Sequence, residues 1–355
     1  MRVAYTLEQC WHRVPGGTGT AALAIAGELS RTPGIELIGV AGRHRRPPTP
    51  GFEPNIPLAR LPLGSPWLYE TWLRFRWPLV ESVVASPDVV HATTIIPPAT
   101  KVPFVTTLHD VAFVRHPEFF TAHGNKVFNK SMSILREKAA LVLCSSRATL
   151  DDCIANGFDT SRLRHVPLGV TAVKPTDDEV HRVRDAYSLP SEFVLFVGTM
   201  EPRKNLQRLI AAMPKARPSL PLVVVGMKGW GDQPAVTDHD VRFTGFVPTE
   251  DLAALYGACT VFAYPSVLEG FGLPILEAMA AGAPVVTSRG TSTEEVAGGA
   301  AVLVDPLDVD SIAAGITDAA FRRDELSALG HLNVSRRTWH RTAELVVQAY
   351  TEAAK

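Results

Sequence analysis

The stretch from residue 261 to residue 287 constrains the fold most, because short apolar runs in it flank a glycine-rich acidic loop. It reads VFAYPSVLEGFGLPILEAMAAGAPVVT. Residues 261–263 are apolar enough for a buried strand, and the apolar spacing after Pro274 predicts a helix that Gly282 ends. Residues 285–287 then resume a strand. The order of strand, loop, helix and strand predicts an α/β sheet.

The loop carries two carboxylates, Glu269 and Glu277, eight positions apart. It places the backbone N–H groups of Gly270, Phe271 and Gly272 at the positive end of the helix, where a phosphate or sugar oxygen can approach. Each carboxylate can accept hydrogen bonds from a pair of hydroxyls, as holding a sugar and a ribose would require. The alternative interpretation is two solvated glutamates at a helix start, where acids are favoured in any case.

Length and composition indicate an ordinary globular chain. Its 355 residues suffice for two domains, and 46% of them are hydrophobic. The net charge of −1 argues against nonspecific nucleic-acid binding. The four cysteines have no paired or zinc-like spacing, and no apolar run approaches the roughly 18 residues of a membrane span. With no signal-peptide core at the N-terminus, we expect a cytoplasmic protein.

The N-terminal half begins with a strand-like run at residues 2–6 and a loop that contains Gly16 and Gly17. A phosphate could lie where this loop enters an alanine-rich helix. Gly17, Gly19 and Ala22 also satisfy the G-x-G-x-x-A pattern of a dinucleotide fold, so an NADP-dependent oxidoreductase is a second hypothesis. About ten residues separate that pattern from its strand, however, which weakens the match.

Residues 47–66 are proline-rich and predict an irregular loop. Residues 88–91 and 104–108 predict buried strands, and His109 and Asp110 follow the second one. A histidine just past the carboxyl end of a parallel strand points into the ligand crevice. The alternative is a core or loop histidine without a function.

Residues 65–84 read SPWLYETWLRFRWPLVESVV and combine five aromatic residues with Arg74 and Arg76. This composition suits a membrane interface or a lipid-linked acceptor, which would place the protein peripherally on the inner face of the plasma membrane. The alternative is a helix packed on the first sheet with its arginines in water.

A polar segment at residues 171–190 predicts a linker with a short helix, and a second strand and helix series follows it. There, FVLFVGTMEPRKNL places Arg203 and Lys204 just beyond an apolar strand. Adjacent cations at this point can hold a diphosphate, although a solvated basic turn would look the same. The acidic pairs Asp238 with Asp240 and Asp308 with Asp310 are predicted to be surface residues rather than metal ligands.

The segments VGTMEPRKNL, GFVPTEDLAALYGAC, YPSVLEGFGLPILEAMAAGAPVV and EEVAGGAAVLVDP resemble, in order and spacing, the C-terminal half of retaining glycosyltransferases of family 4. The N-terminal half adds only the PGG loop, the LHD at residues 108–110 and an HPEFF run. The resemblance implies a GT-B fold with two Rossmann-like, doubly wound parallel-sheet domains facing across a cleft. We assign residues 1–170 to an acceptor-side domain and 191–334 to a nucleotide-sugar-binding domain, with 335–355 as a helix returning to the first domain.

The resemblance also implies roles for individual residues. Glu277 would bind the donor ribose, Glu269 and the amides of residues 270–273, up to Leu273, would bind the sugar and diphosphate, and Arg203 with Lys204 would bind the leaving diphosphate. From the first domain, Gly17 with its neighbour Gly16 would approach the phosphate and His109 would touch the sugar. Phe246 and Val247 would lie near the nucleobase. Many relatives carry arginine where this chain has Thr199, so more of the positive charge that binds the diphosphate would come from Arg203.

The implied reaction is hexosyl transfer with retention and without a metal or other cofactor, because fixed cations and helix-end amides can neutralise the leaving diphosphate. GDP-mannose is the favoured donor and a UDP-sugar is the other. A saccharide or lipid-linked molecule is the expected acceptor. A sugar-nucleotide epimerase and a non-catalytic sugar-nucleotide binder remain further hypotheses.

Overall fold

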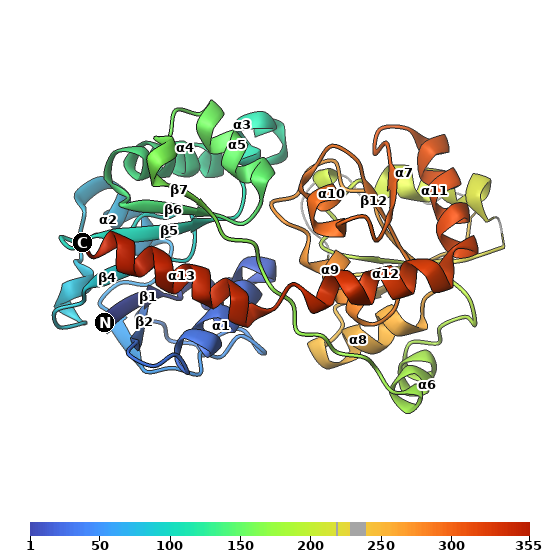
Figure 1. Cartoon of the computed structure of the whole chain (residues 1–355), viewed down its shortest axis with the longest axis horizontal. Coiled ribbons are helices and arrows are strands. Elements are labelled where there is room, and N and C mark those ends of the chain that lie inside the picture. The colour runs from blue at the N-terminus through green and yellow to red at the C-terminus, as the bar shows by residue number, and fades with distance from the viewer. Residues whose placement is uncertain (218, 228–238) are drawn as a thin grey trace. The chain divides into compact units, whose positions relative to one another are not determined.

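The computed structural model describes residues 1–217, 219–227 and 239–355, and these form two compact units (Figure 1). The first unit comprises Met1–Gly169 together with Trp339–Lys355 at the end of the chain. The second comprises Val170–Thr338. Each unit has its own parallel sheet and its own core, so the chain is an α/β protein built from two similar halves.

The sheet of the first unit has the strand order β3-β2-β1-β4-β5-β6-β7, and its neighbouring strands pair in parallel. Its central strands are apolar runs buried on both faces, as parallel sheets require. The strands are β1 (Arg2–Thr6), β2 (Glu36–Gly42), β3 (Leu58–Leu61), β4 (Val89–Ala92), β5 (Phe104–Leu108), β6 (Leu141–Cys144) and β7 (Leu163–His165).

One expectation for this unit is wrong. The proline-rich residues 47–66 are not entirely irregular, because they contain the edge strand β3. Pro57 and Pro62 flank it, and Gly39 on β2 pairs with Leu58. Proline is tolerated at the ends of an edge strand, where one side of the backbone needs no partner. The proline content of this segment therefore predicts a loop where the structure has a strand of four residues.

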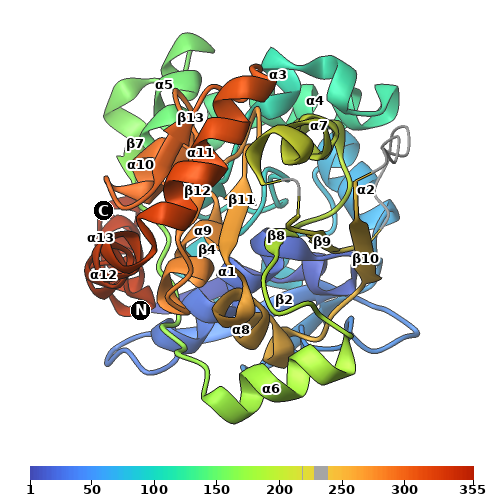
Figure 2. The same cartoon turned by 90° about the vertical axis from the view of Figure 1, so that its right-hand side faces the viewer.

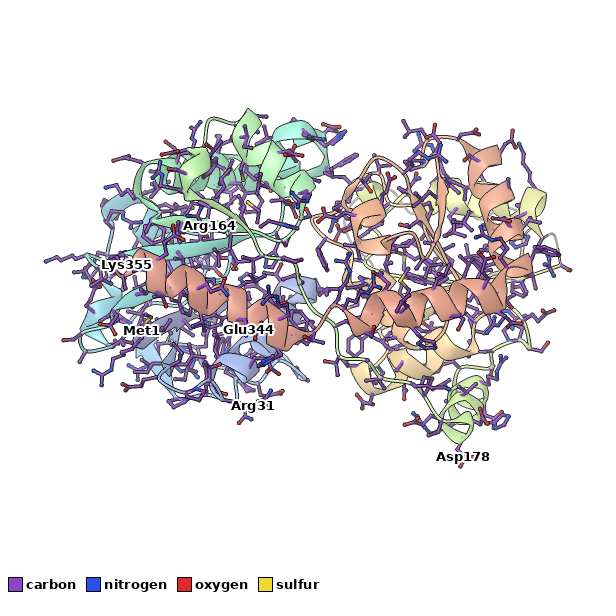
Figure 3. The ribbon with its side chains drawn as sticks, in the orientation of Figure 1. Met1, Arg31, Arg164, Asp178, Glu344 and Lys355 are labelled. Carbon is purple, nitrogen blue, oxygen red and sulfur yellow. The ribbon has the colours of Figure 1, made fainter. Side chains whose placement is uncertain are left out.

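The helices of the first unit include the last one of the chain. They are α1 (Gly16–Leu29), α2 (Trp67–Phe75), α3 (Ala112–Arg115), α4 (Ala122–Lys138), α5 (Arg147–Ala155) and α13 (Trp339–Ala353). Helix α13 packs beside α1 and against β5 and β6 (Figure 1). Its Tyr350 hydroxyl lies 2.6 Å from Nδ1 of buried His91, and its Glu352 pairs with Arg164, which Figure 3 labels beside this helix. These contacts make α13 part of the first unit.

The sheet of the second unit has the order β10-β9-β8-β11-β12-β13, again with parallel neighbours. Its strands are β8 (Val194–Val197), β9 (Leu222–Val225), β10 (Val241–Gly245), β11 (Val261–Tyr264), β12 (Val285–Ser288) and β13 (Val302–Val304). At the ends of β8 and β9 the backbones touch, since a Cβ on Gly226 would lie 2.0 Å from the carbonyl oxygen of Gly198. Glycine is therefore required at position 226.

The helices of the second unit are α6 (Asp177–Ala186), α7 (Leu206–Ala216), α8 (Thr249–Ala258), α9 (Leu273–Ala280), α10 (Ser292–Ala297), α11 (Val309–Phe321) and α12 (Arg323–Ser335). Figure 2 shows α6 beside α8 and α11 beside α7, and both pairs are in contact. Helix α6 falls in the segment 171–190, and Arg182 on it pairs with Asp251 on α8 at 2.6 Å. A capping box between Thr176 and Glu179 starts this helix.

Each sheet has a point where the strand order reverses. In the first unit it lies between β1 and β4, and in the second between β8 and β11. Ligands of open parallel α/β sheets bind beyond the carboxyl ends of the strands at such a point. A functional site is therefore expected in the loops that follow these four strands.

Candidate active site

In the second unit, the loops after β8 and β11 are hydrogen-bonded to each other at the switch point. The β8 loop contains a short 3-10 helix, Pro202–Lys204, and the β11 loop runs from Pro265 to Gly272. Asn205 donates from Nδ2 to the carbonyl of Pro265 at 2.9 Å, and Val267 donates its N–H to the carbonyl of Arg203 at 2.8 Å. These bonds bring the basic and the acidic motif into contact although about 65 residues separate them in sequence.

Arg203, Lys204 and Glu269, which the sequence singled out, form one ion-pair cluster. Nη1 of Arg203 lies 2.9 Å from Oε2 of Glu269, and Nζ of Lys204 lies 2.6 Å from Oε1 of the same carboxylate. The side chains of Lys204 and Glu269 are only 9% and 7% exposed. Burial strengthens the attraction between these charges, since water screens them less.

The protonation of this cluster follows from burial and charge together. Burial by itself raises the pKa of the Glu269 carboxyl, but the positive charges of Lys204 and Arg203 outweigh it and lower the pKa to about 2. Burial lowers the pKa of Lys204, and the charge of Glu269 acts against that shift. Glu269 is thus an anion at neutral pH, held between two cations.

Two further members of the cluster, Glu201 and Tyr264, were not found from the sequence. Glu201 accepts from Nε of Arg203 at 2.8 Å and also from the hydroxyl of Thr199. The hydroxyl of Tyr264, at the end of β11, accepts from Nζ of Lys204, and that Nζ lies 4.9 Å from the centre of the tyrosine ring. Only their position could have indicated these two residues, because Glu201 lies in the loop after β8 and Tyr264 ends β11, both at the switch point.

Helix α9 begins directly after the acidic loop, and its start has no side-chain cap. Gly272 precedes it with φ of 116°, a left-handed conformation that favours glycine, and Pro274 occupies the first turn. The carbonyl of Glu269 accepts from the hydroxyl of Ser292 at 2.6 Å, which fixes the loop to the start of α10. The predicted residues Gly270, Phe271 and Leu273 are buried along this approach to the helix.

The pKa of Glu277 shifts in the opposite direction to that of Glu269. It lies on α9 and accepts from the hydroxyl of buried Tyr256 at 3.1 Å. Burial raises the pKa of Glu277, and the tyrosine hydrogen bond offsets only part of that increase. Within the described residues, no cation is among the groups that shift the pKa of Glu277, so its charge is not compensated as that of Glu269 is.

The remaining predicted residues of the second unit flank β10 or lie at the start of α11. Phe246 is 68% exposed, whereas Val247 is buried. Asp240 pairs with Arg242 at 2.7 Å on the surface, and Asp308 and Asp310 are exposed as predicted, whereas Asp238 lies outside the described residues. Among residues 1–217, 219–227 and 239–355, no three His, Cys, Asp or Glu side chains are grouped closely enough to hold a metal ion.

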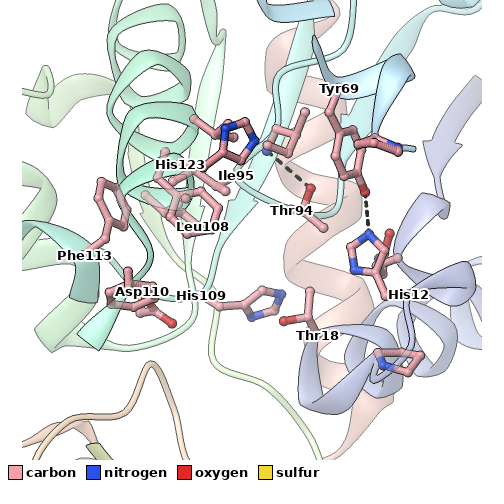
Figure 4. A pocket seen from close by; sticks show the side chains of 18 of the residues that line it. His12, Thr18, Tyr69, Thr94, Ile95, Leu108, His109, Asp110, Phe113 and His123 are labelled. Atoms are coloured by element: carbon pink, nitrogen blue, oxygen red, sulfur yellow. Dashed lines mark hydrogen bonds between the residues drawn. The ribbon is translucent and has the colours of Figure 1, made fainter. Parts of the chain in front are cut away.

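In the first unit, His109 follows β5 and lines a pocket of about 450 Å³ (Figure 4). Its carbonyl accepts from the hydroxyls of Ser145 and Thr149, which fixes the backbone at this position. Burial lowers the pKa of His109, so its imidazole is neutral at pH 7. Figure 4 shows its ring directed toward Thr18 in the first turn of α1, the turn that Gly16 and Gly17 open.

The pocket also contains residues that the sequence gave no reason to select. They come from the loop after β1, from α2 and from the loop after β4, and they include Gln9, His12, Tyr69 and Thr94. Nε2 of His12 lies 3.0 Å from the hydroxyl oxygen of Tyr69. No spacing rule links residues from two loops and a helix, so only the strand order could have indicated them.

The aromatic segment at residues 65–84 divides its side chains between two environments. Trp72 is buried and Tyr69 lines the pocket, as a helix packed on the first sheet requires. Trp67, Phe75 and Trp77 are exposed, by 69%, 73% and 52%. Of the two arginines, Arg76 donates to the carbonyls of Pro97 and Pro98, and Arg74 pairs with Glu70 at 3.1 Å while remaining largely in solvent.

Comparison with known proteins defines the class of protein to which this fold and this charged site belong. Residues 15–173 match the family described as Glycosyltransferase Family 4, and residues 191–320 match the one described as Glycosyl transferases group 1. The structure of HepE from Anabaena in complex with UDP and glucose superposes with a TM-score of 0.75 at 19% identity, over 99% of both chains. The fold is therefore that of the GT-B glycosyltransferases, as the sequence predicted.

Curated relatives are similar to this chain over most of its length. O-antigen chain mannosyltransferase B of Escherichia coli is 34% identical over 264 residues, which are 69% of this chain and 69% of that protein. The serotype-specific mannosyltransferase WbdA of Escherichia coli is 29% identical over 301 residues, and the match spans 37% of WbdA. The chain belongs to glycosyltransferase family 4 and is a glycosyltransferase.

Among the described residues, no helix is both long and apolar enough to cross a bilayer.

Proposed function

We propose that the chain transfers a hexosyl unit, most favourably mannosyl, from a nucleotide-sugar to a saccharide or lipid-linked acceptor, with retention of the anomeric configuration. GDP-mannose is the first donor to test because the relative with 34% identity is named a mannosyltransferase. A UDP-sugar is the second, because HepE holds UDP and glucose on the same fold. The observation that carries the proposal is the buried cluster of Arg203, Lys204 and Glu269 at the second switch point.

In this proposal the second unit binds the donor. Arg203 and Lys204 bind the diphosphate, and the amides that lead into α9 add partial positive charge where the leaving group gains negative charge. Glu277 accepts hydrogen bonds from the ribose hydroxyls, which would stabilise its ionised form and lower its raised pKa. Glu269 orients the two cations and the transferred sugar, and Phe246 with Val247 adjoins the nucleobase.

The first unit supplies the remaining groups. Gly16 and Gly17 at the start of α1 approach the donor phosphate, and neutral His109 donates or accepts a hydrogen bond at the sugar. In this mechanism the acceptor attacks from the face that the diphosphate leaves, without a carboxylate nucleophile. The leaving phosphate then takes the acceptor proton. Cations of the protein neutralise this phosphate, so we propose that no metal is needed.

The proposal is tested by release of nucleotide from GDP-mannose, UDP-glucose and UDP-galactose, with and without EDTA and with a panel of glycoside acceptors. We expect one donor to be used preferentially, activity to persist in EDTA, and the NMR coupling at the new anomeric carbon to report retention. Inversion, or complete loss of activity in EDTA, would contradict the mechanism. Conversion of the donor into another nucleotide-sugar without acceptor would instead indicate an epimerase, and binding without any release a non-catalytic binder.

We also propose that the protein is cytoplasmic and contacts the membrane through its exposed aromatic patch, defined as Trp67, Phe75 and Trp77. Aromatic side chains are favoured at the interface between lipid and water, and Arg74 adds a cation beside them. The protein should float with vesicles that contain phosphatidylglycerol, and Trp67→Ser with Phe75→Ser should reduce the floating fraction. Equal flotation of wild type and variant would exclude the patch.

A further inference from the structure

The pocket of the first unit is a candidate ligand site in its own right. It lies beyond the carboxyl ends of β1, β4 and β5, at the switch point of the first sheet, and its volume of about 450 Å³ is within the usual range for small-ligand sites (Figure 4). Residues of α1, α2, α3 and α4 complete its walls. Of the residues that line this pocket, the proposed function gives a role to His109 alone, so it does not say what the other lining residues bind.

The charge of the lining restricts the occupant. Among the described residues, the pocket lining includes the carboxylates of Glu70 and Asp110 and the histidines His12, His109 and His123, but no lysine or arginine. Burial lowers the pKa of both His12 and His109, so these two are neutral at pH 7. A diphosphate would meet no fixed cation here, unlike in the second unit. The lining therefore disfavours an anion, and it suits an uncharged molecule or an uncharged part of one.

One wall is aromatic. The ring centres of Phe113 and Phe128 are 5.2 Å apart, those of Phe120 and Phe128 are 6.0 Å apart, and those of Phe113 and Phe120 are 6.4 Å apart. The three rings therefore support one another in a fixed arrangement, together with Val127 of α4. Phe120 and Phe128 are only partly buried, so they present apolar area to a ligand.

The other end of the pocket contains an acceptor atom without a donor. Gln9 is 2% exposed, and its Nε2 donates to the hydroxyl of Thr93 at 2.7 Å. Thr93 uses its own hydroxyl proton on the carbonyl of Thr6 at 2.6 Å, so it must accept from the Gln9 amide. This fixes the orientation of the amide and leaves Oε1 of Gln9 buried with no hydrogen-bond partner in the described part of the chain. A ligand hydroxyl is the kind of donor that this oxygen lacks.

We infer that this pocket binds the acceptor as a neutral glycoside with an apolar aglycone, the aglycone against Phe113, Phe120 and Phe128 and a sugar hydroxyl toward Gln9. A purely hydroxylated saccharide would leave the aromatic wall without a matching surface, and an anion would lack a partner. The inference rests on the proposed function, since it names the chemical class of that acceptor. It makes the aromatic wall a determinant of acceptor specificity.

The test compares methyl α-mannoside with octyl α-mannoside as acceptors. We expect kcat/KM to be roughly tenfold higher for the octyl glycoside, because its chain is removed from water at the aromatic wall. Phe120→Ala and Phe128→Ala should bring this ratio close to one by lowering kcat/KM for the octyl glycoside. Phe321→Ala, at an 89% exposed position of the second unit, is the matched control and should preserve the ratio. A wild-type ratio near one, or a ratio that survives both variants, would overturn the inference.

Two further measurements separate this inference from the proposed function. Donor hydrolysis without acceptor depends on the second unit, so a protein that hydrolyses its donor normally but does not prefer the octyl glycoside refutes only the inference. Octyl glycoside should also slow hydrogen exchange in residues 112–128 even when no transfer occurs, and absence of that protection would refute it independently. Gln9→Leu should raise KM for both glycosides, and an unchanged KM would remove Gln9 from the site.

Discussion

The two units share a strand order around their switch points but differ in what they place there. The second unit gathers Arg203, Lys204 and two carboxylates into a buried charged cluster. The first unit forms a pocket whose lining has no lysine or arginine and includes three packed phenylalanines. The topology therefore decides where each site lies, and the loops decide what it can bind. A charged donor and an uncharged acceptor group are the complementary ligands for these two surfaces.

The largest effect expected from this contrast follows loss of a cation in the second unit. Lys204→Ala should lower turnover by roughly 10²–10³-fold, because the leaving diphosphate loses a preorganised donor. The measurement is kcat for nucleotide release, with thermal unfolding to establish that the variant is folded. Lys215→Ala, which removes an exposed lysine paired with Asp310, is the matched control and should retain wild-type turnover. Equal activity of the two variants would show that the charged cluster is not the donor site.

Acid should affect the two units in different pH ranges. His91 in the first unit has its pKa lowered by burial to about 3, so the unfolded chain binds its proton first and stability is lost as pH falls below 6.5. Glu269 in the second unit has a pKa of about 2 against 4.5 in the unfolded chain, so its stabilisation, at most about 3 kcal/mol, persists down to about pH 4.5 and is lost below it.

Hydrogen exchange followed by mass spectrometry measures the two units separately. Between pH 6.5 and 4.5 we expect peptides of β4 and α13 to lose protection before those of β8 and β11. His91→Gln should reduce the pH dependence of the first unit in this range. If the second unit opened first, the assignment of these two buried groups would be incorrect.

Removing the proposed ribose contact of Glu277 should have a smaller effect, and its size should depend on the ligand tested. Glu277→Gln should weaken binding of GDP or UDP roughly tenfold, because a charged acceptor for the ribose hydroxyls is lost, while binding of inorganic diphosphate stays unchanged. Since burial raises the pKa of Glu277, nucleotide affinity of the wild type should also fall as pH decreases through that raised value. Calorimetric titration measures both ligands. Glu250→Gln, at an exposed position of α8, is the control, and weaker diphosphate binding by Glu277→Gln would argue against a ribose role.

The smallest expected effect is an increase in affinity. The four charges of Arg203, Lys204, Glu201 and Glu269 sum to zero, so removing one negative charge should favour an anion. Glu201→Gln should bind inorganic diphosphate a few-fold more tightly, roughly the effect of one partly screened charge. Titration at low and high salt should show the gain declining with salt. Weaker binding at both salt concentrations would mean that Glu201 acts mainly by orienting Arg203.

The charged cluster could be predicted from sequence because its members lie in two short motifs, each beside a clear strand. The apolar runs at residues 194–197 and 261–264 fixed the strands, and Arg203, Lys204 and Glu269 follow directly. Tyr264 was harder to predict because it ends an apolar run and reads as core. The first unit offered less, since Gln9 and His12 in the loop after β1 lie far in sequence from Tyr69 on α2 and meet it only after the chain has folded.

Edge elements were also hard to predict, for a related physical reason. Strand β3 has four residues between prolines and is buried mainly at Leu61, so it has neither the length nor the periodicity of a core strand. The aromatic segment posed a different difficulty. Its composition could not tell buried Trp72 from exposed Trp67, because both depend on which face of α2 meets the sheet.

The most direct test of the central claim is where a nucleoside diphosphate protects the chain from hydrogen exchange. With GDP or UDP at saturation, we predict slower exchange in residues 198–205 and 265–277, which contain the charged cluster and the start of α9. The aromatic wall at residues 112–128 should respond to octyl α-mannoside instead. Nucleotide protection confined to residues 112–128, with none in the two loops of the second unit, would contradict the assignment of donor and acceptor to these two surfaces.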